Sequence, residues 1–221
     1  MMDQDRITQY IHSLDRGHGA FCDQIAKTAR AGRVPVIRKE TAVFLQTMVA
    51  SKQPKHILEV GTAVGYSALL MAQVMPEGTD IITIEKYEPR IPVARENFEK
   101  AGMSDRITLL EGDAGAILKE LDGPFDFIFM DAAKGQYIHY MPEAVRLLAD
   151  GGILMSDNVL QDGDIIESRF AVERRNRTIH SRMRDYLYEL KHSNVLETSI
   201  IPLGDGVALS IKKKKEEKEN Q

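Results

Sequence analysis

Short apolar runs alternate with longer amphipathic stretches through the middle of the chain. The runs are rich in Ile, Leu, Val and Phe, which is typical of strands that are buried on both faces. They predict strands at 57–60, 80–84, 107–110, 126–130 and 152–155. The amphipathic stretches that follow predict helices at 65–75, 89–101, 114–121 and 137–148. This alternation predicts a parallel sheet with helices on both faces and with functional residues at the carboxyl ends of its strands.

The N-terminal part of the chain has a purely helical pattern. Residues 3–31 predict two short helices separated near Gly17, and a third helix is predicted at 41–50. The residues expected to face inward from the third helix are Val43, Phe44, Thr47 and Met48. Because these helices precede the first predicted strand, residues 1–51 are expected to form a helical prefix to the sheet.

Near the C-terminus the pattern changes again. A long helix is predicted at 168–191, and strands are predicted at 196–200 and 207–211 around a tight Pro-Leu-Gly-Asp-Gly turn. Two final strands joined in this way imply an antiparallel strand inserted into the sheet. We therefore predict an α/β fold with a Rossmann-like sheet, mostly parallel with one antiparallel strand near the C-terminus. A single domain is expected over 1–211, followed by a charged, disordered tail at 212–221.

Composition narrows the class of protein. The 221 residues are 43% hydrophobic, which suits one α/β domain with a large core. The net charge of −4 argues against a nucleic-acid binder that relies on a global basic field. The only cysteine, Cys22, cannot form an internal disulfide, which agrees with a reducing cytosol. The sequence shows neither a secretory leader nor an apolar segment long enough to cross a bilayer, so we predict a cytoplasmic protein with no membrane partner.

The first predicted strand runs into the glycine-containing segment HILEVGTAVGYS at 56–67. A strand that turns on glycine into a helix N-terminus presents free backbone N–H groups and a positive dipole end to a ligand. A dinucleotide fingerprint would place glycines at 61, 63 and 66, but the chain has Gly61, Ala63 and Tyr66. A pyrophosphate is therefore disfavoured, and an adenosine-type cofactor without one is favoured.

Acidic residues follow the second and third predicted strands. Glu85 ends the second strand, 20 residues past Gly65, where an acidic side chain binds ribose hydroxyls in Rossmann-like sheets. The alternative for Glu85 is an ordinary carboxylate at a strand end. Asp113 opens the following helix, so it is either an N-cap or an adenine contact, and the two roles are compatible.

Asp131, Asp157 and Asn158 follow the next two predicted strands. Two carboxylates and an amide oxygen at neighbouring strand ends form a hard oxygen set that suits Mg²⁺ and leaves positions open for substrate. No cluster of Cys and His suggests zinc. The alternative for Asp157 and Asn158 is a turn or a helix cap. A cation here would disfavour the ammonium form of nearby Lys134 and favour a neutral amine that acts as a base, although Lys134 is otherwise an ordinary surface lysine.

Together these motifs resemble the cation-dependent O-methyltransferases of the catechol and caffeoyl-CoA type, which use S-adenosylmethionine. The resemblance rests on LEVGTAVGYS, IEKYE, the DxxKxxY pattern of DAAKGQY, and SDNV. It implies a class I methyltransferase sheet in which Asp131, Asp157 and Asn158 hold Mg²⁺. Catalysis would rest on Lys134 as the base and on Asp131. The cofactor-binding residues that it implies are Ile37, Glu59, Gly61, Ser67, Glu85, Asp113, Ala114 and Asp131.

Stretches outside the catalytic motifs are similar to the bacterial tRNA 5-hydroxyuridine methyltransferases. They are VPVIRKE, ERRNR and IIPLGDGVALSIKKK. This similarity implies methylation of the 5-hydroxyl of wobble 5-hydroxyuridine in the tRNA anticodon stem-loop, which would give 5-methoxyuridine. The alternative is a small catechol-like or phenolic substrate, since such relatives share the catalytic motifs. The resemblance also implies a homodimer.

The predicted C-terminal helix is locally basic. Residues 169–191 contain seven basic and three acidic side chains, and Arg174, Arg175 and Arg177 are the predicted RNA contacts. A basic helix can neutralise phosphates even in an acidic protein. The alternative is a solvated helix face. The lysine-rich tail at 212–221 is better explained as a solubilising segment.

Overall fold

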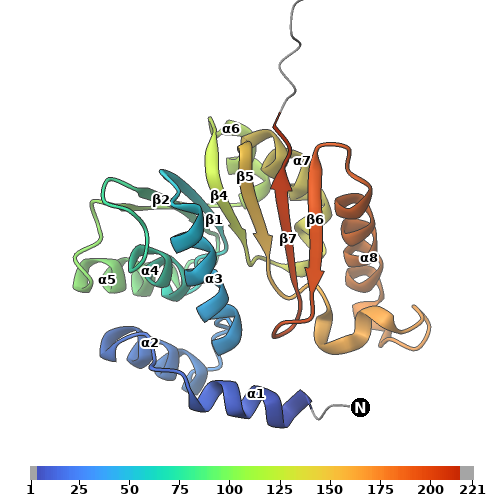
Figure 1. Ribbon diagram of the computed structural model, residues 1–221, viewed down its shortest axis with the longest axis horizontal. Coiled ribbons are helices and arrows are strands. Elements are labelled where there is room, and N and C mark those ends of the chain that lie inside the picture. The colour runs from blue at the N-terminus through green and yellow to red at the C-terminus, as the bar shows by residue number, and fades with distance from the viewer. Residues whose placement is uncertain (1–3, 215–221) are drawn as a thin grey trace, which may run out of the picture.

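The computed structural model describes residues 4–214, and the observed elements follow the predicted alternation (Figure 1). The helices are α1 (Gln4–Ser13), α2 (Ala20–Ala31), α3 (Lys39–Lys52), α4 (Tyr66–Ala72), α5 (Ile91–Lys100), α6 (Ala114–Glu120), α7 (Tyr137–Leu147) and α8 (Arg177–His192). The strands are β1 (His56–Val60), β2 (Asp80–Glu85), β3 (Ile107–Glu111), β4 (Phe125–Met130), β5 (Leu148–Ser156), β6 (Leu196–Ile201) and β7 (Val207–Lys212). Short 3₁₀ segments are η1 (Lys134–Gln136), η2 (Gln161–Ile166) and η3 (Arg174–Asn176).

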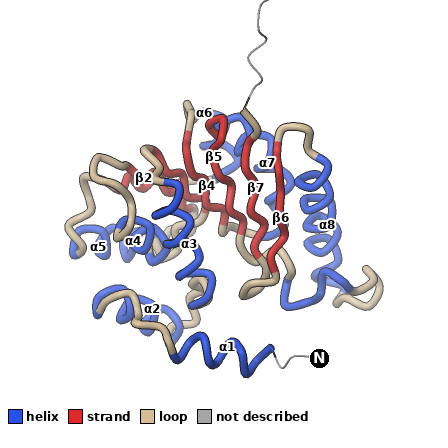
Figure 2. Tube along the Cα trace, in the orientation of Figure 1, coloured by secondary structure: helices blue, strands red, loops and turns tan. Residues whose placement is uncertain are grey.

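The strands form a seven-stranded sheet in the order β3-β2-β1-β4-β5-β7-β6 (Figure 2). Strands β1 to β5 run parallel, whereas β7 pairs antiparallel with both β5 and β6. The predicted fold, with one antiparallel strand inserted near the C-terminus, is therefore confirmed. The strand order reverses between β1 and β4, and the carboxyl ends of strands at such a reversal border a ligand-binding crevice.

Two apolar layers cover the sheet, one on each face. Side chains alternate between them along each strand, as the pleat requires. In β4, Phe127 and Phe129 pack into the layer under α2, α3, α4 and α5, whereas Ile128 and Met130 pack into the layer under α6, α7 and α8 (Figure 1). Because both faces are covered, the strands carry the nearly continuous apolar runs that made them recognisable in the sequence.

The predicted helix at 168–191 begins too early. In the structure α8 starts at Arg177, and the preceding residues form a loop that contains η3. The buried stripe of α8 starts only at His180, and in the segment 168–176 before it Val172 alone is buried. Phe170 in this segment is 82% exposed, and Ile166 at the end of η2 is 81% exposed.

The predicted inward face of α3 is confirmed for two of its four residues, Phe44 and Met48, which pack against the core. Val43 is 43% exposed, Thr47 is exposed, and Phe44 and Met48 are only partly buried. The buried residues of the helix are instead Thr41, Ala42, Leu45 and Val49. Apolar residues occur on every side of α3, so their spacing alone does not identify the face that packs on the sheet.

The predictions for the two ends of the chain are only partly covered by the described residues. The N-terminal helices separate around Gly17 as predicted, and the single cysteine, Cys22, is buried and unpaired. Of the predicted disordered tail, 215–221 lie outside the described residues, while Lys212 still belongs to β7. Among residues 4–214, no helix is both long enough and apolar enough to span a bilayer.

Candidate functional site

A cleft of about 360 Å³ opens at the carboxyl ends of β1, β2 and β4. Of the residues predicted to bind the cofactor, those that line the cleft are Ile37, Gly61, Ser67, Glu85, Ala114 and Asp131. They come from the loop before α3, the turn after β1, the first turns of α4 and α6, and the ends of β2 and β4. The crevice predicted from the strand order therefore contains six of the eight predicted cofactor residues, while Glu59 and Asp113 lie outside its lining.

Gly61 allows the turn after β1 to pass close to the end of β4. Its φ is +106°, a conformation that side chains with a Cβ rarely adopt. A Cβ built on Gly61 would lie 2.2 Å from the carbonyl oxygen of Asp131. The backbones of the Gly61 turn and of Asp131 thus approach each other closely beneath the cleft, and this approach requires glycine at position 61.

Gly61→Ala is therefore expected to destabilise the fold by about 2–4 kcal/mol and to abolish cofactor binding, because left-handed strain and a backbone clash add together. Chemical denaturation and calorimetric titration with S-adenosylmethionine measure these effects. The matched control is Gly78→Ala, where φ is +82° and nothing lies within 4 Å of the added Cβ. Equal behaviour of the two variants would show that the close approach is unimportant.

Glu85 fastens the glycine turn to the end of β2. Its carboxylate accepts hydrogen bonds from the backbone N–H groups of Ala63 at 2.8 Å, Lys86 at 3.0 Å and Tyr87 at 2.8 Å. The side chain is mostly buried but lines the cleft. A carboxylate has about four acceptor positions, so one remains for a ligand hydroxyl. Contact with a ribose stays a prediction.

Glu59 lies beneath the cleft. It is fully buried, and it accepts hydrogen bonds from the hydroxyls of Ser67 and Thr83. Burial raises the pKa of Glu59 to about 8, and the charges of Asp131 and Glu85 act in the same direction. The structure therefore places Glu59 as a support for Ser67, which does line the cleft, and not at the cleft surface.

Asp113 caps α6. Its side chain accepts a hydrogen bond from the backbone N–H of Gly115 at 2.9 Å, which confirms the predicted N-cap. It also lies 3.7 Å from the Lys86 ammonium, and both side chains are exposed. The neighbouring residues Gly112 and Ala114 line the cleft, so an adenine contact from Asp113 remains a prediction.

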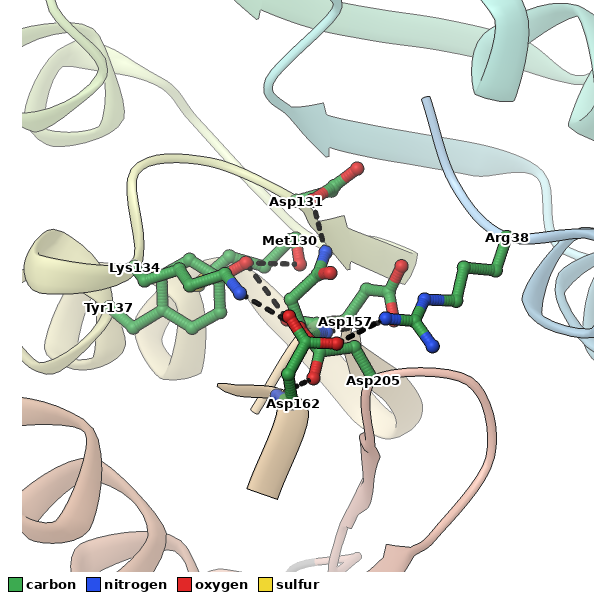
Figure 3. Close-up of polar contacts among 9 residues, drawn as sticks. Arg38, Met130, Asp131, Lys134, Tyr137, Asp157, Asp162 and Asp205 are labelled. Carbon is green, nitrogen blue, oxygen red and sulfur yellow. Dashed lines mark hydrogen bonds and ion pairs between the residues drawn. The ribbon is translucent and has the colours of Figure 1, made fainter. Parts of the chain in front are cut away.

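The predicted metal ligands come together at the ends of β4 and β5 (Figure 3). The Asn158 amide donates to Asp131 at 2.9 Å, and the Asp157 carboxylate accepts from the backbone N–H of Asn158 at 2.8 Å. Burial raises the pKa of Asp131 to about 6 and that of Asp157 to about 7, and repulsion from Asp131 adds to the shift of Asp157.

These residues fit a hard divalent cation. Two desolvated carboxylates that repel each other would be stabilised by positive charge between them. Rotation of the Asn158 amide by half a turn would exchange its nitrogen for its oxygen and add a third oxygen ligand. Within 4–214, no group of three or more His, Cys, Asp or Glu side chains is arranged to hold a metal, so a zinc-type cluster is absent from that range.

Lys134 is not an ordinary surface lysine. Its ammonium donates to the Asp205 carboxylate at 2.8 Å, and its side chain is about one third exposed (Figure 3). Asp205 itself is 4% exposed. Sequence analysis missed Asp205 because the Gly-Asp-Gly segment was interpreted only as a turn. The available signal was the antiparallel direction of β7, which places the β6–β7 turn at the carboxyl ends of the parallel strands.

The predicted RNA contacts do not share one helix face. Arg174 and Arg175 are exposed on η3, where Arg175 pairs with Glu173 at 2.7 Å. Arg177 instead donates to the carbonyl oxygens of Phe170 at 3.1 Å and Val172 at 3.3 Å. The Arg177 guanidinium therefore holds the loop before α8, and contact of any of these arginines with RNA stays a prediction.

Comparison with known proteins identifies the family of the chain. The chain matches the family described as O-methyltransferase over residues 22–213. A catechol O-methyltransferase from Niastella koreensis is 40% identical over 129 residues, which are 56% of this chain and 58% of that relative. Caffeoyl-CoA O-methyltransferase 1 from Eucalyptus globulus is 32% identical over 179 residues, which cover 75% of this chain and 70% of the relative.

A solved structure of a methyltransferase has the same fold as this chain. The SAH-bound methyltransferase PaMTH1 from Podospora anserina is 28% identical, with a TM-score of 0.85 over 96% of this chain and 95% of the other. The predicted class, an S-adenosylmethionine-dependent O-methyltransferase, is thus confirmed at the level of the family. The family match over most of the chain, the relatives and the shared fold establish that this chain belongs to the O-methyltransferase family.

Proposed function

We propose that the chain transfers the methyl group of S-adenosylmethionine to one of two neighbouring oxygens on a small catechol-like or phenolic substrate, with Mg²⁺. The observation that carries this proposal is the set formed by Asp131, Asp157 and Asn158, which borders the cofactor cleft through Asp131. The relatives are named for catechol and caffeoyl-CoA, and this supports the small-substrate alternative over the tRNA substrate first implied by the flanking stretches.

Each residue of the site would have a separate role in the reaction. Asp131, Asp157 and Asn158 would hold Mg²⁺, which, when bound, would orient both substrate oxygens and favour ionisation of the hydroxyl that is methylated. Lys134 would take the hydroxyl proton at its Nζ, and Asp205 would stabilise the ammonium that results. Asp131 lines both sites and so would fix the substrate oxygen relative to the methyl group in the cleft.

Metal affinity is expected to rise with pH, because both carboxylates must lose their protons before they can bind a cation. With a pKa of about 6 for Asp131 and about 7 for Asp157, affinity should increase steeply between about pH 5.5 and 7.5 and level off above that range. Titration with Mn²⁺ followed by electron paramagnetic resonance measures this dependence. An affinity that is constant over the range would contradict the assigned ligands.

The proposed activity is tested with labelled S-adenosylmethionine and Mg²⁺. Catechol and a caffeoyl ester are offered in one arm, and tRNA that contains 5-hydroxyuridine is offered in a parallel arm. Methylation of the small substrates alone supports the proposal. Methylation of the tRNA alone would replace it with the second candidate, and transfer to neither would refute both.

The second candidate is methylation of wobble 5-hydroxyuridine in tRNA, whose O4 and 5-hydroxyl oxygens are also neighbours. The observation in its favour is a set of exposed aromatic and basic side chains on the segment that follows the metal ligands. Phe170 is 82% exposed, and Arg174 and Arg175 are exposed nearby in sequence, which provides a ring for base stacking and charges for phosphates. Binding to tRNA that falls steeply with salt, and with charge reversal at Arg174 and Arg175, would support it. The implied homodimer likewise remains a prediction, to be measured by sedimentation.

A further inference from the structure

Asp205 is a buried carboxylate in the β6–β7 turn that contacts two parts of the site at once (Figure 3). One oxygen, Oδ2, accepts the Lys134 ammonium at 2.8 Å. The other, Oδ1, accepts the backbone N–H of Asp162, in the loop that begins with Asp157 and Asn158. A single side chain therefore joins the lysine to the loop that carries two of the three metal ligands.

The backbone of the same turn clamps this metal-ligand loop, residues 157–162. Val159 N–H donates to the carbonyl oxygen of Gly206 at 3.0 Å, and Leu160 N–H donates to that of Asp205 at 2.9 Å. Gly206 has a φ of +86°, and a Cβ there would lie 2.3 Å from Leu160 Cγ. The turn thus packs its Gly206 backbone directly against the Leu160 side chain, and the two backbone hydrogen bonds hold the loop to the turn.

The clamped loop is conformationally unfavourable by itself. Asn158, Gln161 and Asp162 have φ values of +61°, +53° and +52°, and none of them is glycine. This conformation costs about 1–2 kcal/mol for a residue such as Gln161 and less for Asn and Asp, which adopt it more readily, so neighbouring contacts help to hold the loop. The bond from Asp162 N–H to Asp205 supplies one of these contacts, and an ion pair between Asp162 and Arg38 supplies another.

We propose that Asp205 is a positioning residue, which fixes the Lys134 amine relative to the metal-ligand loop and so to the substrate oxygens held there. This inference rests on the proposed function, in which Lys134 receives the hydroxyl proton. In the proposed role Asp205 touches neither substrate nor cofactor, and it acts only by holding Lys134 against the loop. Its chemistry requires a carboxylate, because two oxygens serve two donors, whereas an asparagine offers only one acceptor oxygen.

A double-mutant cycle tests whether Asp205 acts through Lys134. Asp205→Asn is expected to lower kcat by about 100-fold, with the KM for S-adenosylmethionine unchanged, because misplacement of a reacting group by about 1 Å costs that much. In a Lys134→Ala background the same substitution should cost almost nothing further. A merely structural role predicts the same penalty in both backgrounds, and that result would overturn the proposal. The matched control, Asp164→Asn, removes an exposed carboxylate two residues past the loop, in η2, and should leave kcat unchanged.

An NMR measurement of the Lys134 ammonium tests the role of Asp205 independently of methyl transfer. With ¹⁵N-labelled lysine, the hydrogen-bonded Lys134 ammonium should give a slowly exchanging NMR signal in the wild type and in Asp164→Asn. The signal, assigned by its loss in Lys134→Ala, should vanish in Asp205→Asn. Persistence of the Lys134 signal in Asp205→Asn would overturn the proposal, and this test requires no substrate. If the signal vanishes as expected but no substrate is methylated, only the proposed function is refuted.

If Asp205→Asn fails to fold, Asp205→Glu provides the test instead. The added methylene keeps the charge but displaces the carboxylate from its two donors. A fall in kcat with normal cofactor affinity is expected, while wild-type kcat in this variant would overturn the proposal.

Discussion

Asp157→Ala is expected to lower the metal-dependent rate of methyl transfer by about 1,000-fold or more. A cation that orients and ionises the reacting hydroxyl contributes several kcal/mol, and about 4 kcal/mol corresponds to that factor. Initial rates measured against Mg²⁺ concentration show the effect. Affinity for S-adenosylmethionine should stay unchanged, because Asp157 does not line the cofactor cleft.

Stability measurements distinguish this loss from misfolding. Burial raises the pKa of Asp157 to about 7, so the folded state binds this proton more tightly than the unfolded state does. The stability contributed by Asp157 without metal therefore decreases as pH rises from about 4 to about 7, and at about pH 8 the buried charge is unfavourable. The metal-free variant should then unfold at the wild-type temperature or above it. Normal Mg²⁺-dependent rates in this variant would remove Asp157 from the metal site.

Lys134→Ala is expected to lower kcat by about 100- to 10,000-fold, which is the usual contribution of a positioned base. The KM for S-adenosylmethionine should change little, because Lys134 is not part of the cleft lining. The rate is measured at saturating cofactor and metal.

Lys134→Arg separates a base from a fixed positive charge. Arginine keeps the charge but does not give up its proton in proteins. If Lys134 is the base, the arginine variant should be as slow as the alanine variant. If the arginine variant is active while the alanine variant is not, Lys134 supplies only charge, and the proposed proton transfer is wrong.

The sheet could be predicted because its strands are buried on both faces. Phe127 and Ile128 are neighbours in β4 that pack into opposite apolar layers, so the strand appears in the sequence as a continuous apolar run. The final antiparallel strand was predicted from the tight turn before it. The strand order then places Gly61, Glu85 and Asp131 around one cleft, and this is why a local motif was sufficient to predict where that cleft lies.

The errors arose where tertiary contacts decide the conformation. The helix predicted at 168–191 begins instead at Arg177, and the residues before it, including the exposed Phe170, form a loop that Arg177 holds through the backbone carbonyls of Phe170 and Val172. Glu59 sits next to the glycine turn in the sequence, yet its side chain points beneath the cleft to Ser67 and Thr83.

Asp205 could not be recognised from its local sequence because its partners are remote. It lies 71 positions from Lys134 and 43 positions from Asp162 along the chain. A turn between two glycines explains the local sequence completely, so nothing near Asp205 indicates a second role. Only the insertion of β7 next to β5 brings this turn to the edge of the sheet where the metal ligands lie.

The most direct test compares catechol with phenol as methyl acceptors, with Mg²⁺ present and after its removal by a chelator. The two acceptors differ by one hydroxyl, so they isolate the requirement for two neighbouring oxygens. We predict rapid transfer from S-adenosylmethionine to catechol that stops on chelation and returns with Mg²⁺, and negligible transfer to phenol under either condition. Equal methylation of phenol and catechol, or transfer to catechol that persists without metal, would contradict the proposed use of Asp131, Asp157 and Asn158.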